Sequence, residues 1–369
     1  MWEFIIIHPK FLNIIESNNY VDFDKMKDIY IKDLNLKPYL EEITIFSHVF
    51  KNPIKINENI IHIAMSLNSK YVYILLVSMT SILFNCNKNE TFIKFHILCT
   101  PDVNDTTILK IKSLMKQFPE NLELIFYNMG KNFISKKDNY RSQATYYRLI
   151  LPIIINSDRI IYLDGDTLSF KDLKEMYNSN FDDNYVLGFL GFVSWGLDYL
   201  GIKANNWINA GVLLLNLKKI REDNKCNELL RSIKSKIKLN NDDNTVINYA
   251  LYPKIGKLDA KYVIFNFLDR MDIKVYSKYL RQKINISKLE YAIKNPGIIH
   301  FVLCAPKPWY FKTKFIKKVT ACKKRKNCSC RKFHYLWYIY AKKTEFYHEI
   351  INYYNIYFFL QKTTNLQYD

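Results

Sequence analysis

The chain has 369 residues, 49% of them hydrophobic and 24% charged, which is ordinary for a globular protein and excludes a disordered or collagen-like chain. Lys and Arg outnumber Asp and Glu by 54 to 35, and the formal net charge of +19 suits an anionic partner such as a nucleic acid, a phosphorylated ligand or a lipid surface. A codon bias towards Lys, Asn, Ile and Tyr explains the same charge without a partner, so both explanations stay open.

The order of the predicted elements indicates an α/β protein. A continuous apolar run at residues 60–64 predicts a buried strand, and apolar residues at three- and four-residue spacing over 72–83 predict a helix. Strands are predicted next at 95–99, 122–127 and 159–163, with helices at 105–118 and at 144–150, the last ending near Pro152. Strands that alternate with helices favour a mainly parallel sheet covered on both faces, which binds ligands at the carboxyl ends of its strands.

After residue 166 the pattern is less regular, with strands predicted at 186–190 and 212–217 and a basic helix through Lys236. Residues 1–58 contain no recognisable site and are predicted to form an N-terminal extension. The central domain is predicted at 59–311. Residues 312–369, basic and rich in aromatic side chains, form a predicted C-terminal appendage with an aromatic helix over 346–360.

The seven cysteines are scattered, and three of them lie in apolar stretches typical of buried free thiols, namely Cys86, Cys99 and Cys304. We therefore expect a reducing compartment. A zinc knot in the C-terminal appendage is disfavoured, since the spacing of its cysteines matches no common structural-zinc pattern. No secretory signal and no transmembrane segment are predicted, so the expected location is the cytoplasm or the periphery of a membrane.

Two carboxylates follow the predicted strand at 159–163 directly, in the sequence Asp164-Gly165-Asp166. Alternate residues of an extended chain point the same way, and hard oxygen ligands suit Mg²⁺ or Mn²⁺. Gly165 lets the backbone approach a ligand closely. The pattern predicts a metal site, while an ordinary strand followed by an Asp-Gly turn is the alternative.

A second polar group lies far downstream, where the short apolar strand at 298–301 contains His300 and is followed by Lys307-Pro308-Trp309. An imidazole at this place would complete a metal shell, and the lysine would meet a phosphate as a point charge. A buried histidine that serves only the core is the alternative interpretation.

Six segments follow one another in a characteristic order: Ile61–Asn68, Ser142–Leu149, Arg159–Thr167, Trp207–Val212, Asp243–Asn248, and His300 with Lys307-Pro308-Trp309. In this order they resemble the motifs of glycosyltransferase family 8, which includes glycogenins, bacterial lipopolysaccharide glucosyl- and galactosyltransferases and plant galacturonosyltransferase-like proteins. The resemblance runs from about Ile60 to Trp309. It implies a GT-A fold for the central domain, with a mixed, mainly parallel sheet flanked by helices and a Rossmann-like nucleotide-binding half.

The resemblance also implies the ligands. It implies a UDP-sugar donor and Mn²⁺, with Mg²⁺ as the alternative, held by Asp164, Asp166 and His300. Ala64, Ser66 and Asn68 would line the base and ribose, and Arg148 and Lys307 would flank the diphosphate. The residues expected at the donor sugar are Asn209, Ala210, Asp243 and Asn244, of which Asp243, Asn244 and Asn209 count as the catalytic set.

The implied reaction is the transfer of a hexose, glucose or galactose in the first instance, from UDP to an acceptor hydroxyl with retention of configuration. A double displacement needs a protein nucleophile, and Asp243 is the one carboxylate in a matching segment. A front-face route, in which the leaving phosphate guides the incoming hydroxyl, needs none and is our preferred hypothesis. A divalent ion and fixed cations would stabilise the charge that develops on UDP.

Two other classes of function stay open at this stage. One is a degenerate transferase that serves as a scaffold, and the other is a basic protein that binds single-stranded nucleic acid, although the sequence contains no recognised nucleic-acid motif. The basic tail suggests contact with an anionic membrane surface. The sequence names neither the acceptor, for which a glycan, a protein and a lipid are the alternatives, nor the oligomeric state, for which a homodimer is one alternative.

Overall fold

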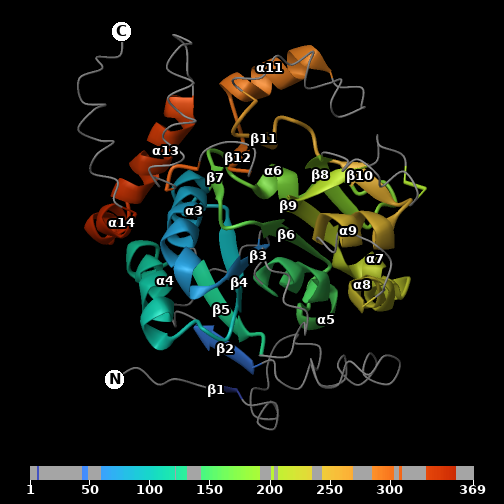
Figure 1. The fold of residues 1–369 in the computed structure, drawn as a ribbon, viewed down its shortest axis with the longest axis horizontal. Coiled ribbons are helices and arrows are strands. Elements are labelled where there is room, and N and C mark those ends of the chain that lie inside the picture. Colours follow the sequence, from blue (N-terminus) through green and yellow to red (C-terminus); the bar gives the residue numbers. More distant parts are fainter. Residues whose placement is uncertain are drawn as a thin grey trace.

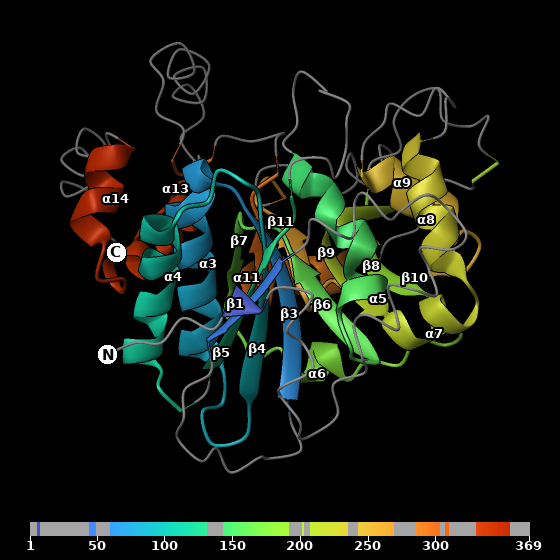
Figure 2. The ribbon, with the colours of Figure 1, turned by 90° about the horizontal axis from the view of Figure 1, so that it is seen from below.

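The computed structural model describes residues 6–7, 44–48, 60–120, 122–130, 143–191, 201–202, 207–234, 243–268, 285–302, 307–309 and 330–354. Within these residues the main sheet has nine strands in the order β1-β2-β5-β4-β3-β6-β9-β8-β10. A smaller sheet has the order β11-β12-β7. Helices cover both faces of the main sheet (Figures 1 and 2).

Four parallel strands form the centre of the main sheet: β3 (Ile60–Leu67), β4 (Phe92–Cys99), β5 (Leu122–Asn128) and β6 (Arg159–Leu163). Their side chains are buried almost throughout, as expected for strands covered on both faces. The four predicted strands are confirmed, and β3 and β4 are longer than predicted. Their carboxyl ends meet at one edge of the sheet, where ligands of α/β proteins bind.

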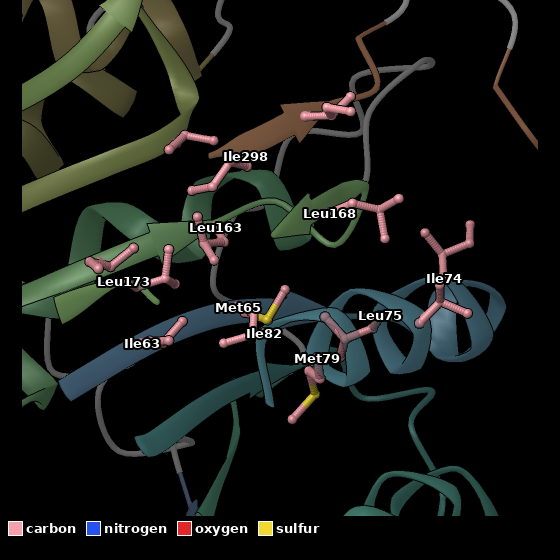
Figure 3. Packing of buried hydrophobic residues seen from close by; sticks show 14 of the residues in the cluster. Ile63, Met65, Ile74, Leu75, Met79, Ile82, Leu163, Leu168, Leu173 and Ile298 are labelled. Carbon is pink, nitrogen blue, oxygen red and sulfur yellow. The ribbon is translucent and has the colours of Figure 1, made fainter. Parts of the chain in front are cut away.

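One face of the sheet is covered by α3 (Val72–Asn85) and α4 (Asp105–Gln117), both predicted. In this core Met65 of β3 lies beside Leu75 and Met79 of α3 (Figure 3). The residue spacing predicted that only one face of α3 would be buried. The helix is instead buried on all sides, because β7, α4 and α13 surround it. Cys86 and Cys99 are buried free thiols in this core, as predicted. The third predicted one, Cys304, lies outside the described residues.

The other face is covered by η3 (Gln143–Ile150), α5 (Leu151–Ile154), α7 (Leu217–Glu222), α8 (Lys225–Lys234) and α9 (Asp243–Leu251). The predicted helix at 144–150 is a 3-10 helix, and it does not end near Pro152. Instead Pro152 stands in the first turn of α5, where its missing N–H would have no helical partner anyway. The predicted basic helix through Lys236 corresponds to α8, and residues 235 and 236 lie outside the described residues.

Antiparallel strands complete the main sheet. The strand β9 (Ile208–Asn216) runs antiparallel to β6 and to β8 (Val186–Leu190), and β10 (Ile255–Lys257) is parallel to β8. The strand predicted at 212–217 therefore begins four residues earlier, at Ile208. Since β9 runs against β6, its first residues lie at the edge where β6 ends. The smaller sheet consists of β7 (Thr167–Ser169), β11 (Val263–Phe265) and β12 (Ile298–His300).

Segments from both ends of the chain join this body. From the predicted N-terminal extension, β1 (Ile6–Ile7) pairs with β2 (Thr44–His48), which pairs with the edge strand β5. From the predicted C-terminal appendage, α13 (Cys330–Lys342) packs on α3, and α14 (Tyr347–Tyr353) follows it. The domain boundaries at 58 and 311 stay predictions, and residues 355–360 of the predicted aromatic helix lie outside the described residues. None of the described helices is long and apolar enough to cross a membrane.

Short elements connect these layers, namely η2 (Ser69–Tyr71), α6 (Lys174–Tyr177) and α11 (Ile286–Lys294). The first of them follows β3 directly, and Asn68 caps it by accepting a hydrogen bond from the Tyr71 backbone N–H at 3.1 Å. The polypeptide thus turns sharply at the carboxyl end of β3, next to the predicted nucleotide-binding residues.

A buried chain of titratable side chains crosses the centre of the sheet. The Nδ1 atom of His62 lies 2.9 Å from Nε2 of His96, whose Nδ1 lies 2.9 Å from the hydroxyl of Tyr127. Burial, helped by the charge of Lys94, lowers the pKa of His62 to about 4. Burial also holds the pKa of His96 well below its ordinary value. Both rings are therefore neutral in the folded protein at neutral pH.

This pair makes the fold sensitive to acid. In the unfolded chain a histidine binds its proton near pH 6.5, so between pH 6.5 and about 4 the unfolded state takes up protons that folded His62 and His96 do not. The free energy of unfolding should fall across that window by about 1.4 kcal/mol per pH unit for each histidine. Urea unfolding at pH 7.5 and pH 5 measures the difference. A His62→Gln variant should reduce the slope, and equal stability at both pH values would contradict the assignment.

Candidate active site

Three side chains converge at the carboxyl end of β6. The Nε2 atom of His300 lies 3.5 Å from Oδ2 of Asp164 and 3.3 Å from Oδ1 of Asp166. Ligand atoms of the three residues all lie within 4.8 Å of one another. The histidine is buried and the two carboxylates are partly exposed. The predicted grouping of two acids and a distant imidazole is thus present in the structure.

The smaller sheet brings His300 to the acids. Directly after Asp166, β7 pairs with β12 so that Thr167 stands opposite His300, and the backbone N–H of Phe301 donates to the Asp166 carbonyl at 2.9 Å. The Nδ1 atom of His300 has no hydrogen-bond partner among the described residues. Its ring is oriented by packing instead, with the Phe265 ring centroid at 6.0 Å.

Arg148 is the central cation of the site and is almost completely buried. Its Nη2 donates to Oδ1 of Asp164 at 2.8 Å, and its Nη1 lies 3.2 Å from Oδ2 of Asp243 and donates to the Ala210 carbonyl. The guanidinium also stacks over the ring of Tyr162, with Cζ 4.2 Å from the centroid. Burial lowers the pKa of Arg148, but the two carboxylates outweigh burial and raise it, so the group stays charged. Arg148 therefore connects η3, β6, β9 and α9.

The hydroxyl of Tyr162 defines which oxygen of Asp164 is free. It lies 3.1 Å from Oδ1 of Asp164 and 3.2 Å from Oγ of Ser66. An ionised carboxylate only accepts, so Tyr162 donates to Asp164 and the Ser66 hydroxyl donates to Tyr162. Oδ1 of Asp164 then receives bonds from both Arg148 and Tyr162. The remaining oxygen, Oδ2, is the one that faces His300.

The same division applies to Asp166. Its Oδ2 pairs with Nζ of Lys307, and its Oδ1 faces His300. Burial raises the pKa of Asp166, but the charge of Lys307 and the hydrogen bond with His300 outweigh burial and hold the pKa well below its ordinary value. The carboxylate is therefore ionised at any physiological pH, as a metal ligand must be.

Amide side chains connect the start of β9 to α9. Oδ1 of Asn244 accepts from the backbone N–H of Ala210 at 2.8 Å and from Nδ2 of Asn209 at 3.4 Å. Oδ1 of Asn209 accepts from the Gly211 N–H at 2.9 Å. Asn248, one turn along α9, bonds both the N–H and the carbonyl of Ile208. These bonds hold the start of β9 against α9, whose first residue, Asp243, is paired with Arg148.

The remaining predicted site residues lie at the same edge. Ala64 is buried on β3 opposite Tyr162, and Ser66 is bonded to Tyr162. Asn68 caps η2, so its side-chain oxygen already has a backbone partner. Gly165 lies between the two acids, and a Cβ atom on it would lie 3.4 Å from Cδ1 of Leu75, an ordinary van der Waals contact. The structure thus brings the predicted metal, nucleotide and sugar residues to one edge, while their roles stay predictions.

Two residues that the sequence did not single out prove important to the geometry. A Cβ atom on Gly211 would lie 2.1 Å from Cε1 of His300 and 2.6 Å from Oδ2 of Asp164, so these two side chains can approach each other as they do only beside a glycine. The glycine is visible in the sequence within Asn209-Ala210-Gly211, but the need for it is visible only in space. Tyr162 occupies an ordinary buried strand position, so nothing in the sequence marks its hydroxyl.

The model of the family "Glycosyl transferase family 8" matches residues 62–313, more than half of the chain. The chain belongs to glycosyltransferase family 8. The predicted family is therefore confirmed, and family membership supports a glycosyltransferase.

Two curated relatives show a distant similarity in sequence. The chain is 24% identical over 223 residues to glycosyltransferase GlyB of Streptococcus pneumoniae, covering 59% of this chain and 50% of GlyB. It is 22% identical over 214 residues to lipopolysaccharide 1,3-galactosyltransferase of Salmonella typhimurium, covering 54% of this chain and 62% of that enzyme. The chain thus spans only about half to three fifths of the length of these relatives.

Solved structures agree on the fold. The apo bifunctional glycosyltransferase WbbM matches with a TM-score of 0.63 at 18% identity, covering 93% of this chain and 63% of WbbM. The galactosyltransferase LgtC, solved with donor and acceptor sugar analogues, matches with a TM-score of 0.50 at 20% identity, covering 69% of this chain and 91% of LgtC. The predicted GT-A fold, with its mixed sheet flanked by helices, is confirmed.

A substitution of Gly211 tests directly whether Asp164, Asp166 and His300 together hold a metal ion. In Gly211→Ala the new methyl group must displace His300 or Asp164, so we expect Mn²⁺ affinity to fall by at least about tenfold and stability by about 1–3 kcal/mol. Calorimetric titration with Mn²⁺ and thermal unfolding measure the two effects.

Gly188→Ala is the matched control, because its methyl group would crowd the side chains of Ile208 and Leu213 on the same sheet without reaching His300. It should lose stability but keep Mn²⁺ affinity. Equal Mn²⁺ affinity in Gly211→Ala and the unmodified protein would show that these three residues do not hold the ion.

Proposed function

We propose that this chain transfers a hexose from a UDP-sugar to an acceptor hydroxyl with retention of configuration, using Mn²⁺. The observation that carries the proposal is the convergence of Asp164, Asp166 and His300 within 4.8 Å at the carboxyl end of β6, flanked by two cations. UDP-glucose and UDP-galactose are the first donors to test. The acceptor is a glycan, a protein or a lipid hydroxyl.

The residues fit a divalent ion by the chemistry of their donor atoms. Two carboxylate oxygens and one imidazole nitrogen face a common point, and the other oxygen of each carboxylate is bonded to Arg148 and Tyr162 or to Lys307. A set of oxygens with one nitrogen suits Mn²⁺ better than Mg²⁺, which prefers oxygen alone. When bound there, the ion would supply positive charge to the diphosphate of the leaving UDP.

The protein's own cations support the departure of UDP from two sides. Lys307, beside Asp166, is a compact ammonium on a flexible stem and would contact a phosphate oxygen directly. Arg148 is enclosed by Asp164, Asp243 and the Ala210 carbonyl, so we assign it the task of orienting these groups and of holding positive charge close to the sugar. Fixed charges of this kind stabilise developing negative charge without having to reorganise.

The environment of Asp243 favours the front-face route. Its carboxylate is buried and paired with Arg148 at 3.2 Å. A nucleophile has to reach the anomeric carbon with a free lone pair, and pairing with a guanidinium lowers the reactivity of those lone pairs. We therefore assign Asp243 to holding the donor sugar together with Asn209, Ala210 and Asn244, while the leaving phosphate guides the acceptor hydroxyl.

The central experiment is a panel of UDP- and GDP-sugars with Mn²⁺, scored for donor hydrolysis or transfer. We expect turnover with a UDP-hexose, its loss in EDTA and its recovery when Mn²⁺ is restored. Asp166→Asn should lower turnover on the order of 100-fold or more, because the ion loses a charged ligand. Asp172→Asn is the matched control, since Asp172 bonds the Asn87 N–H away from the site.

Three outcomes would count against the proposal. Turnover that is unaffected by EDTA would exclude the metal, and turnover with GDP-sugars alone would exclude the UDP donor. Binding of UDP without hydrolysis or transfer for every donor tried would favour a catalytically inactive scaffold of the same fold.

Peptide mass spectrometry decides between the two routes. After incubation of the unmodified protein with donor and no acceptor, we expect no hexose on the peptide that carries Asp243. Asp243→Asn should retain measurable turnover, lower by roughly 10–100-fold, because Arg148 loses one of its two carboxylates. A hexose trapped on Asp243, or complete loss of turnover in a folded Asp243→Asn protein, would instead favour double displacement.

A further inference from the structure

The helix α13 lies beyond the residues that the family model matches, which end at residue 313, yet it contacts the segment that carries Lys307. The hydroxyl of Tyr338 donates to the carbonyl of Pro308 at 2.7 Å, and Tyr338 is buried. This bond fixes the backbone one residue after Lys307. Figure 1 shows α13 beside α3, on the same side of the molecule as β7 and β12.

Aromatic packing continues this contact to the cation itself. The ring centroids of Trp337 and Trp309 are 5.4 Å apart, and both rings are buried. The Nζ atom of Lys307 lies 5.7 Å from the Trp309 ring centroid. The side chain that pairs with Asp166 therefore lies over a ring that is itself in contact with Trp337 of α13.

The residue that follows the metal ligand is held by the same helix. Phe301, directly after His300, has its ring centroid 5.8 Å from that of Trp309 and 6.4 Å from that of His334 on α13. One helix thus contacts the chain next to both His300 and Lys307, the two site residues that come from the end of the family match.

The helix is itself anchored on the body of the protein by different residues. The Tyr340 hydroxyl accepts from Nδ2 of Asn85 at the end of α3, and its ring lies 5.8 Å from that of Phe170. Phe333 is buried in the same core as α3. Because the packing of the Phe333 and Tyr340 rings anchors α13, the helix stays in place when only the Tyr340 hydroxyl is removed, and it can serve as a rigid support for the contacts made by Tyr338 and Trp337.

We propose that α13 is a positioning element of the active site and that Tyr338 is the positioning residue that sets the place of Lys307. This inference rests on the proposed function in that Lys307 is taken to bind the diphosphate. A lysine side chain is a flexible chain of four methylene groups. Its ammonium is therefore held at Asp166 only if the backbone of Lys307 and the neighbouring Trp309 ring are fixed. The predicted appendage is thereby part of the donor site.

The test compares two variants of the same helix in the full chain. Tyr338→Phe removes the hydroxyl that bonds Pro308, and Tyr340→Phe removes one that bonds Asn85 instead. In the ligand-free protein, hydrogen exchange of the peptides that contain Phe301 and Lys307 should become faster in Tyr338→Phe and remain unchanged in Tyr340→Phe. Equal exchange in the two variants at these peptides would overturn the proposal.

The second measurement is UDP affinity with saturating Mn²⁺. Tyr338→Phe should weaken UDP binding by roughly 3–10-fold, about the effect of one hydrogen bond, and Tyr340→Phe should not. In a Lys307→Ala background Tyr338→Phe should have no further effect, because it acts through that lysine. Additive losses would mean a general structural role and would overturn the inference. If the unmodified protein binds no UDP, the proposed function fails, while hydrogen exchange still decides the role of α13.

Discussion

The buried guanidinium of Arg148 is the interaction on which the site depends. A buried cation is strongly unfavourable unless carboxylates and carbonyls surround it, and leaving one of its partners out costs several kcal/mol. Its partners come from separate elements: Asp164 follows β6, Ala210 lies on β9 and Asp243 begins α9. The need to pair this one charge therefore fixes the positions of the Asp164 and Asp243 carboxylates relative to each other, and in the proposed function these two groups face the metal and the sugar.

The net charge of the site is compatible with the proposed binding of a divalent ion and a diphosphate. Three carboxylates, those of Asp164, Asp166 and Asp243, are paired with two cations, Arg148 and Lys307. The side chains other than His300 thus carry one surplus negative charge, which in the proposed function would attract the divalent cation. With that cation bound the sum becomes positive, and an anionic diphosphate would then be attracted in turn. Binding of a cation first and of an anion second explains why the site combines acidic and basic side chains instead of forming one basic patch.

The sequence predicted the strands that carry the acids because their apolar runs and the Asp164-Gly165-Asp166 ending are local signals. Other features were not predictable in this way. The start of β9 at Ile208 contains small and polar residues that do not resemble a strand, and its antiparallel direction is decided by pairing with β6 and β8. The hydrogen bond that the Tyr162 hydroxyl donates to Asp164 and the close approach of Gly211 to His300 depend on distances between strands. The spacing of residues along the sequence does not reveal these distances.

The C-terminal helix shows what composition alone does not reveal. Its basic and aromatic content indicated a separate segment, and the structure shows in addition that Phe333, Trp337 and Tyr338 belong to the same core as α3. Burying an apolar side chain contributes about 1.5–3 kcal/mol, so three such residues account for several kcal/mol, a large part of the 5–15 kcal/mol that stabilises a typical domain. Side chains of the same helix contact Trp309, which lies two residues after Lys307, and Phe301, which directly follows His300. The aromatic contacts that bury these side chains therefore also lie beside the two site residues Lys307 and His300.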